Sequence, residues 1–160
     1  MLRLHPMTQG QFDQYLATAV AGYALAHTKA GDCEPDEAME LAQKDYDQLL
    51  PNGLASVNHY LYSAIDDAED NPVTVGMIWF QVKEGKRRTT AFIYDFNVRD
   101  DLQGKGYGTR LMKCFEEAAM GLGVSKVSLN VFGYNHSARA LYEKLGYEIT
   151  GIGMTKVLMR

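Results

Sequence analysis

Residues 98–112 read Val98-Arg99-Asp100-Asp101-Leu102-Gln103-Gly104-Lys105-Gly106-Tyr107-Gly108-Thr109-Arg110-Leu111-Met112, between a strand-like run and an amphipathic helix. Glycines at the alternate positions 104, 106 and 108 allow tight turns and a close approach to a ligand, because no Cβ stands in the way. A loop of this kind at a helix N-terminus directs free N–H groups and the positive end of the helix dipole at an anion. The stretch therefore predicts a site for a phosphate-bearing ligand.

The spacing of this loop distinguishes between three known kinds of phosphate loop. A P-loop needs Lys-Ser or Lys-Thr directly after its last glycine, whereas Lys105 here precedes Gly106. The dinucleotide fingerprint G-x-G-x-x-G needs a glycine where Thr109 stands. The string does match Gln-x-x-Gly-x-Gly, as Gln103, Gly106 and Gly108, and so resembles the acetyl-CoA pyrophosphate loop of the GNAT superfamily of N-acetyltransferases. Alone, such a loop can also be a simple strand-to-helix turn.

A second motif follows the strand-like run Val127-Ser128-Leu129-Asn130-Val131. It resembles the GNAT signature N-x-x-A-x-x-x-Y-x-x-x-G-[FY], which is carried here by Asn135, Ala138, Tyr142, Gly146 and Tyr147. Two independent motifs in the order of the family make a coincidence improbable. The part of the chain whose motifs resemble the family runs from roughly residue 73 to residue 160. Over nearly its whole length, the chain also resembles small bacterial GNAT proteins with a Phe-Ile-Tyr-Asp-Phe strand.

The hydrophobic periodicity predicts helices and strands in a definite order. A strand at 2–6 precedes helices at about 9–28 and from residue 35 to about 50, three strands follow at about 58–66, 73–83 and 88–98, and a helix leads out of the glycine loop. A strand at 125–132, a helix at 135–144 and two closing strands at 147–150 and 154–159 complete the chain. The pattern alone indicates an α/β (α+β) fold. The resemblance implies the GNAT arrangement, a mixed, mostly antiparallel sheet flanked by helices, in one domain over residues 1–160.

The composition, 46% hydrophobic and 22% charged, is that of an ordinary globular domain. The 160 residues carry a net charge of −4, which argues against a protein that binds nucleic acid by neutralising phosphates. Cys33 and Cys114 have no metal-ligand spacing and suggest no disulfide framework. No apolar run resembles a signal peptide or a membrane span. We therefore expect a cytoplasmic protein with no metal and no membrane or nucleic-acid partner, and the resemblance is compatible with a homodimer.

The resemblance implies acetyl-CoA as cosubstrate and assigns residues to hold it. The glycine loop would bind the pyrophosphate, and the N–H of Val98 would polarise the thioester carbonyl as an oxyanion donor. Asn135 suits a helix N-cap, and its counterpart in the family also contacts the pantetheine or phosphate arm. The residues expected at the cosubstrate are Val98, Arg99, Gln103, Gly104, Lys105, Gly106, Tyr107, Gly108, Thr109 and Asn135.

Tyr142 and Asp95 are the expected catalytic side chains. In GNAT enzymes the tyrosine at the position of Tyr142 is a general acid, and a phenol of pKa about 10 can protonate a departing thiolate of pKa about 8.5. The alternative for Tyr142 is a core tyrosine. Asp95 matches the Asp of the Glu-Asp pair in polyamine-type members, but Tyr94 stands in place of the Glu, so a water chain could replace a carboxylate base. Strict alternation places Asp95 and Val98 on opposite faces unless a bulge intervenes.

These features predict an acetyl-CoA-dependent N-acetyltransferase that moves an acetyl group to a primary amine by direct attack in a ternary complex. Tyr15, Tyr23, His27 and Tyr46 fall where GNAT proteins build the acceptor pocket, and helical spacing also suits them to packing. Two alternatives are a non-catalytic acyl-CoA-binding regulatory module of the same fold and an acyltransferase that uses another acyl-CoA. The sequence does not identify the small-molecule or peptide amine that accepts the group.

Overall fold

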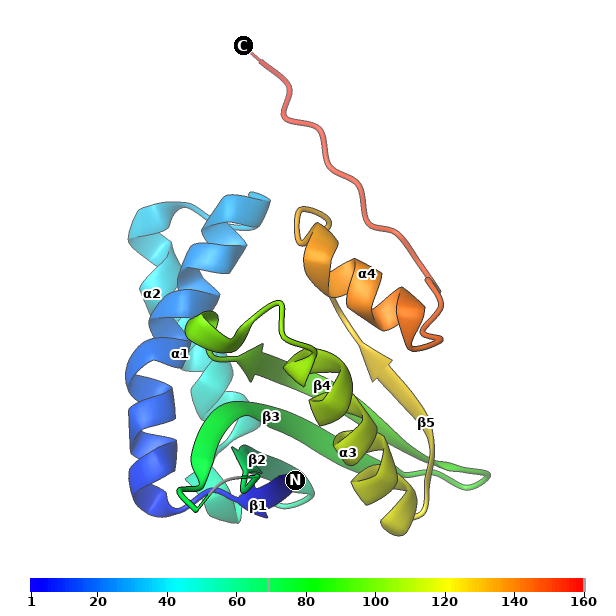
Figure 1. Ribbon diagram of the computed structural model, residues 1–160. Helices are drawn as coiled ribbons and strands as arrows, with labels where there is room; N and C mark the ends of the chain where they lie inside the picture. The colour runs from blue at the N-terminus through cyan, green and yellow to red at the C-terminus, as the bar shows by residue number, and fades with distance from the viewer. Residues whose placement is uncertain (69, 160) are drawn as a thin grey trace.

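The computed structural model describes residues 1–68 and 70–159 of the chain, which form a five-stranded sheet with helices on both faces (Figure 1). Two short 3₁₀ turns, Gly53–Ala55 and Asp100–Leu102, join longer elements. The helices and strands are, in chain order, β1 (Leu2–Pro6), α1 (Gln9–Ala30), α2 (Pro35–Leu49), β2 (His59–Asp66), β3 (Val73–Glu84), β4 (Thr89–Val98), α3 (Tyr107–Gly121), β5 (Val124–Leu129) and α4 (His136–Lys144).

The sheet has the order β1-β2-β3-β4-β5, and only its last pair is parallel. Side chains from α3 fill one face together with Ile78 and Phe80, while α1 and α2 cover the other face around Trp79. The alternation of Ile78, Trp79 and Phe80 between the two cores follows from the two-residue period of a strand. All three side chains are almost completely buried, so β3 lies at the centre of the protein.

Local sequence explains where the first helices begin. Thr8 caps α1 by accepting from the N–H of Gln11 at 3.2 Å, and the Gln11 side chain accepts from the N–H of Thr8 at 2.9 Å, which completes the predicted capping box. Pro35 opens α2, where the absent N–H of proline costs no hydrogen bond. Both helices therefore start within a residue or two of the predicted positions.

The predicted order of elements is confirmed as far as α4. The prediction of two closing strands, at 147–150 and 154–159, is wrong. Residues 147–159 form no regular secondary structure, and they extend away from the sheet as a single tail (Figure 1). A strand requires a neighbour to bond its backbone, and the sheet ends at β5 without pairing this tail. β5 is also shorter than predicted, since it ends at Leu129 rather than at Phe132.

None of the helices formed by residues 1–68 and 70–159 combines the length and the apolar character that a membrane crossing requires. Within the same residues, no group of three or more His, Cys, Asp or Glu side chains is arranged to hold a metal ion.

Gly76 allows β3 to approach the end of β4 closely. A Cβ at this position would clash with the backbone oxygen of Asn97 and would lie 3.2 Å from Leu111 of α3. The neighbouring atoms are backbone and a fully buried side chain, so neither can move without disturbing the core. Gly76 thus fixes the position of the strand end that leads into the glycine loop.

We expect Gly76→Ala to destabilise the protein by about 1–3 kcal/mol, the usual cost of inserting a methyl group into a packed site. The corresponding fall in Tm is about 3–10 °C for a chain of this size, measured by thermal unfolding. Gly22→Ala is the matched control, because the open space beside Gly22 on helix α1 accepts a methyl group and alanine favours the helix. Equal Tm values for Gly76→Ala and the wild type would contradict the close approach.

Candidate active site

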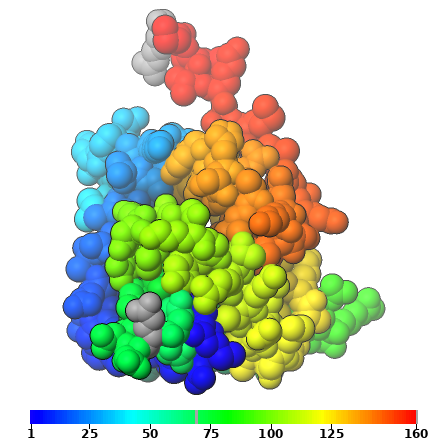
Figure 2. Space-filling view, in the orientation of Figure 1, coloured from blue at the N-terminus to red at the C-terminus, as the bar shows by residue number. Residues whose placement is uncertain are grey.

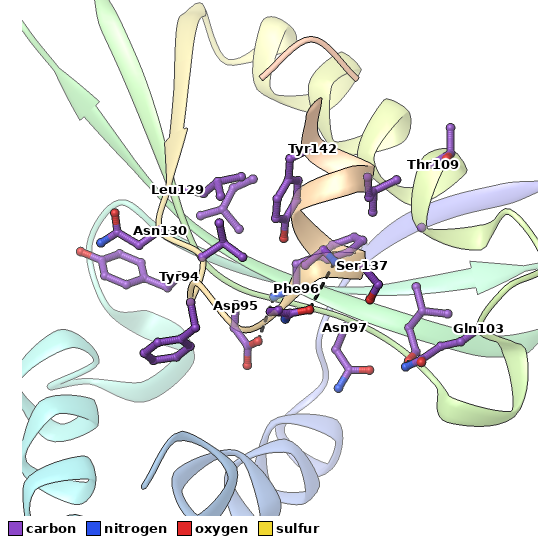
Figure 3. A pocket seen from close by; sticks show the side chains of 18 of the residues that line it. Tyr94, Asp95, Phe96, Asn97, Gln103, Thr109, Leu129, Asn130, Ser137 and Tyr142 are labelled. Carbon is purple, nitrogen blue, oxygen red and sulfur yellow. Dashed lines mark hydrogen bonds between the residues drawn. The ribbon is translucent and has the colours of Figure 1, made fainter. Parts of the chain in front are cut away.

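A pocket of about 800 Å³ opens where β4 and β5 separate (Figure 3). The parallel pairing of these strands ends at Ile93 and Leu129, although β4 continues to Val98. Side chains from both faces of the sheet reach the opening, because within residues 1–68 and 70–159 no strand pairs with this edge of β4 beyond Ile93. The residues that line it are Ile93, Tyr94, Asp95, Phe96, Asn97, Val98, Gln103, Gly104, Gly106, Gly108, Thr109, Leu129, Asn130, Val131, Phe132, Asn135, Ser137, Ala138, Leu141 and Tyr142.

A β-bulge at Tyr94 changes the direction of the β4 side chains at the start of this opening. Trp79 of β3 pairs with Asp95 and Phe80 pairs with Ile93, so Tyr94 is the extra residue. Tyr94 packs against the core under α1 and α2, and Asp95 bonds to a residue of α1, so two successive side chains lie on one face. Val98 belongs to the core on the α3 face, which confirms the predicted opposite placement of Asp95 and Val98.

Beyond the bulge, the open edge of β4 presents the N–H of Val98 to the pocket. Arg99 donates its N–H to Val75 of β3, and in an antiparallel ladder the N–H and C=O groups of alternate residues then point away from β3. The two residues that face the opening are Phe96 and Val98. The Phe96 N–H donates to Asp95 Oδ1 at 2.9 Å, and Gln103 Nε2 donates to the Val98 carbonyl at 3.0 Å. The Val98 N–H therefore faces the pocket.

Asp95 is held by two donors at the inner end of the pocket. Besides the Phe96 N–H, the Tyr15 hydroxyl donates to Asp95 Oδ2 at 2.6 Å. Burial raises the pKa of the Asp95 carboxyl above its usual value of 3.8, and these two hydrogen bonds oppose the rise. The Tyr46 hydroxyl lies 3.5 Å from that of Tyr15 and extends this polar group toward α2.

Tyr142 reaches the same pocket from the other face of the sheet, where α4 packs against the α3-side core. Its ring centroid lies 6.3 Å from that of Phe96 and 5.8 Å from that of Tyr147. Burial, and then the negative charge of Asp95, raise the pKa of the Tyr142 phenol to about 12. Tyr142 is therefore protonated and neutral at neutral pH, in the form that can donate a hydrogen bond or a proton.

The glycine loop forms the wall of the pocket at the N-terminus of α3. Gly104 and Gly106 have φ values of 75° and 84°, the left-handed region in which a side chain is strained. Within the described residues, no backbone N–H from Gly104 to Thr109 donates to a protein acceptor, and the first donor to do so is Arg110, at 3.2 Å from the Gly106 carbonyl. These free N–H groups and the dipole of α3 make the loop suitable for an anion.

The charged and aromatic side chains expected beside this loop have other partners. Arg99 donates to Asp101 and, at 3.1 Å, to the carbonyl of Thr74, and Tyr107 donates to Asp66 at 3.0 Å. The side chains of Arg99, Lys105 and Tyr107 do not line the pocket. Lys105 is exposed, and no ion pair engages it within the described residues.

The other expected cosubstrate residues lie at the pocket. Asn135 caps α4 by accepting from the Ala138 N–H at 3.3 Å, as its position predicted. The Gln103 side chain bonds the end of β4, so it positions the loop relative to the strand. Two contacts to Asp95 were not predicted from the sequence. The N–H of Phe96 orients the Asp95 carboxyl. The Tyr15 hydroxyl also bonds to Asp95, whereas the helical spacing of Tyr15 indicates only a packing residue.

The chemistry of acetyl-CoA fits this arrangement of donors. Its pyrophosphate needs several N–H donors, which the loop from Gly104 to Thr109 offers. A thioester carbonyl needs a donor directed at its oxygen, and the Val98 N–H faces the pocket. Asp95 and Tyr142, a carboxyl and a phenol from opposite faces of the sheet, can then accept and donate protons at the reacting atoms.

Comparisons with known proteins agree with the fold and show the family. The profile of the Acetyltransferase (GNAT) family matches residues 19–147, and the chain belongs to this family. It is 35% identical to YycN, an uncharacterised N-acetyltransferase of Bacillus subtilis, over 98% of this chain and 99% of YycN. It is 31% identical to YdgE of the same organism, over 97% of each chain. The crystal structure of Bacillus subtilis YycN superposes with a TM-score of 0.94 and 34% identity, covering 100% of both chains.

The raised pKa of Asp95 makes a pH-dependent prediction for Asp95→Asn. The folded protein binds a proton at Asp95 more tightly than the unfolded chain does, since the folded pKa lies above 3.8. The contribution of Asp95 to stability is therefore complete at low pH and is lost as the pH rises through the folded pKa. Asparagine does not ionise, so the Tm of the variant minus that of the wild type should increase between about pH 4 and pH 8.

Thermal unfolding across this pH range measures the difference. Tyr94→Phe serves as the control, because it changes the adjacent residue and its bond to Gln81 while it keeps the carboxyl of Asp95. The Tm difference of this control should not change with pH. A difference for Asp95→Asn that is constant, or that decreases with pH, would show that the pKa of the Asp95 carboxyl is not raised in the folded protein.

Proposed function

We propose that this chain, as one N-acetyltransferase domain, transfers an acetyl group from acetyl-CoA to a primary amine by direct attack in a ternary complex. One observation carries the proposal: Asp95 and Tyr142 line a single pocket from opposite faces of the sheet, beside a loop of free N–H groups. Such a pocket allows a donor and an acceptor to enter from different sides and meet at the opening. No covalent intermediate on the protein is needed, because the two substrates are held together.

The backbone holds and polarises the donor in this proposal. The N–H groups from Gly104 to Thr109 bind the pyrophosphate, and Lys105 adds a positive charge outside the pocket. The acyl-CoA supplies an activated thioester carbonyl, and the Val98 N–H stabilises the negative charge that develops on its oxygen. One donor of this kind typically contributes about 2.7–4 kcal/mol to the stabilisation of a transition state. Gln103 supports this role of Val98, because its side chain donates to the Val98 carbonyl and so fixes the orientation of the backbone there.

Asp95 accepts the proton of the attacking amine, directly or through a water chain. An alkylammonium group has a pKa near 10.4 and cannot attack until it loses a proton. The raised pKa of Asp95 makes its carboxylate a stronger base than an exposed one, and the bond from Tyr15 fixes its orientation. The negative charge of Asp95 also favours a cationic acceptor over a neutral one.

Tyr142 donates a proton to the departing thiolate. A phenol of pKa about 12 remains protonated at neutral pH, and a thiol has a pKa of about 8.5. The phenol is therefore always in the form that can donate, although the higher pKa of the phenol limits the driving force of full proton transfer. The hydrogen bond that it makes to the developing thiolate supplies much of the stabilisation.

Turnover of a panel of amines tests the proposal, with release of free CoA thiol as the readout. We expect Tyr142→Phe to lower kcat by about 10²- to 10⁴-fold, the usual contribution of a general acid, while the Kd for acetyl-CoA changes little. Tyr60→Phe is the matched control, since it removes a hydroxyl from a residue of β2 that does not line the pocket. Acetyl-CoA binding without turnover of any amine would contradict the proposed acetyltransferase activity. An unchanged kcat in Tyr142→Phe would contradict the role of Tyr142 as general acid.

A further inference from the structure

Asp66 is a buried carboxylate on the α3 side of the sheet, and the proposed reaction does not use it. It ends β2 and is 9% exposed. Its Oδ1 accepts from the Ala68 N–H at 3.2 Å and from the Met1 amino group at 3.1 Å. Its Oδ2 accepts from the Tyr107 hydroxyl at 3.0 Å and lies 3.5 Å from Arg110 Nη2. One oxygen of Asp66 is thus directed at the first turn of α3.

Within the described residues, Tyr107 carries the one side chain between Gly104 and Thr109 that hydrogen-bonds to another residue. Its ring is half-buried against the core on the α3 side and does not line the pocket. Figure 2 shows the lime-coloured residues around position 100 lying against the green turn that follows β2. The bond from Tyr107 to Asp66 therefore holds the glycine loop from outside the pocket.

The composition of the loop makes this anchor important. Glycine places few limits on the backbone, and glycines stand directly before and after Tyr107, at 106 and 108. Without an anchor, the N–H groups of the loop would sample many directions. A ligand that uses several of them would then have to order them on binding, which weakens affinity. Gln103 fixes the start of the loop through the Val98 carbonyl, and Tyr107 fixes the end that begins α3.

Arg110 supports the same placement of Tyr107. A cation in the first turn of a helix is disfavoured by the helix dipole, and the carboxylate of Asp66 offsets this effect. The Arg110 guanidinium lies 5.0 Å from the centroid of the Tyr107 ring, a favourable contact between a cation and an aromatic face. The carboxylate, the phenol and the guanidinium thus hold one another at the N-terminus of α3.

We propose that Asp66 is a positioning residue for the acyl-CoA cosubstrate, which acts through Tyr107 to hold the glycine loop in the conformation that binds the pyrophosphate. The inference rests on the proposed function, since it takes the loop to be the pyrophosphate site. Asp66 does not line the pocket, so its effect passes through the backbone of the loop. The thiol arm of the cosubstrate, which the proposed function places at Val98 and Tyr142, does not depend on this bond.

Tyr107→Phe breaks the bond and keeps the ring in the core, and NMR titrations compare its binding of CoA and of pantetheine. Pantetheine has the thiol arm of CoA without the pyrophosphate. We expect the Kd for CoA to rise about tenfold, the loss typical of one hydrogen bond to a charged group, and the Kd for pantetheine to stay close to that of the wild type. Unchanged pantetheine binding also shows that the variant is folded.

Tyr62→Phe is the matched control for this experiment. Tyr62 lies on β2 and packs against the same core, and its hydroxyl has no hydrogen-bond partner among the residues that the structure describes. The Kd of this control for CoA should equal that of the wild type. In turnover, Tyr107→Phe should raise the KM for acetyl-CoA and lower kcat far less, because Asp95 and Tyr142 are unchanged.

Two results would overturn the positioning role. One is an equal Kd for CoA in the wild type and in Tyr107→Phe, and the other is an equal loss of affinity for CoA and for pantetheine, which would indicate a merely structural bond. A wild type that binds no CoA would contradict the proposed function itself, and this inference with it. The failure of the positioning role alone is therefore distinguishable, since the wild type then still binds CoA.

Discussion

The loss of pairing between β4 and β5 beyond Ile93 and Leu129 is the constraint on which the site depends. Among the described residues, the last five of β4 have no neighbouring strand on that side, so each exposed polar group of this edge needs another partner. Asp95 and Gln103 bond the Phe96 N–H and the Val98 carbonyl, which leaves the Val98 N–H facing the pocket. The same opening lets side chains of both sheet faces meet, so one structural feature accounts for the donor, the carboxyl and the phenol.

The sequence allowed most of the fold to be predicted because its signals are local. The capping box at Thr8 and the proline at position 35 are read from neighbouring residues, and the strands from 59 to 98 alternate with short turns. The glycine loop was predicted for the same reason, since Gly104 and Gly106 have the left-handed backbone that only glycine adopts easily. Where neighbouring residues in the chain determine the local structure, the sequence pattern is sufficient to predict it.

The predictions from sequence were incomplete where an interaction joins distant parts of the chain. Tyr15 and Asp95 are separated by 80 residues, and nothing in the helical spacing of Tyr15 distinguishes a packing tyrosine from one that orients a carboxyl. Arg99 was expected at the cosubstrate, but its side chain bonds to Asp101 and to the carbonyl of Thr74. The closing strands at 147–159 have the composition of strands, yet a strand forms only when a neighbour supplies its hydrogen bonds. In the part of the chain that the structure describes, the sheet ends at β5 and no strand pairs with this segment.

The central claim is that the free N–H groups of the glycine loop and Val98 form one acyl-CoA site. The most direct test is a titration of the ¹⁵N-labelled protein with CoA and then acetyl-CoA, following the amide resonances by NMR. The resonances from Gly104 to Thr109 should move with both ligands, and that of Val98 should move further with acetyl-CoA, while the amides of β1 stay in place. Unchanged loop resonances at saturating ligand would mean that the loop is only a strand-to-helix turn.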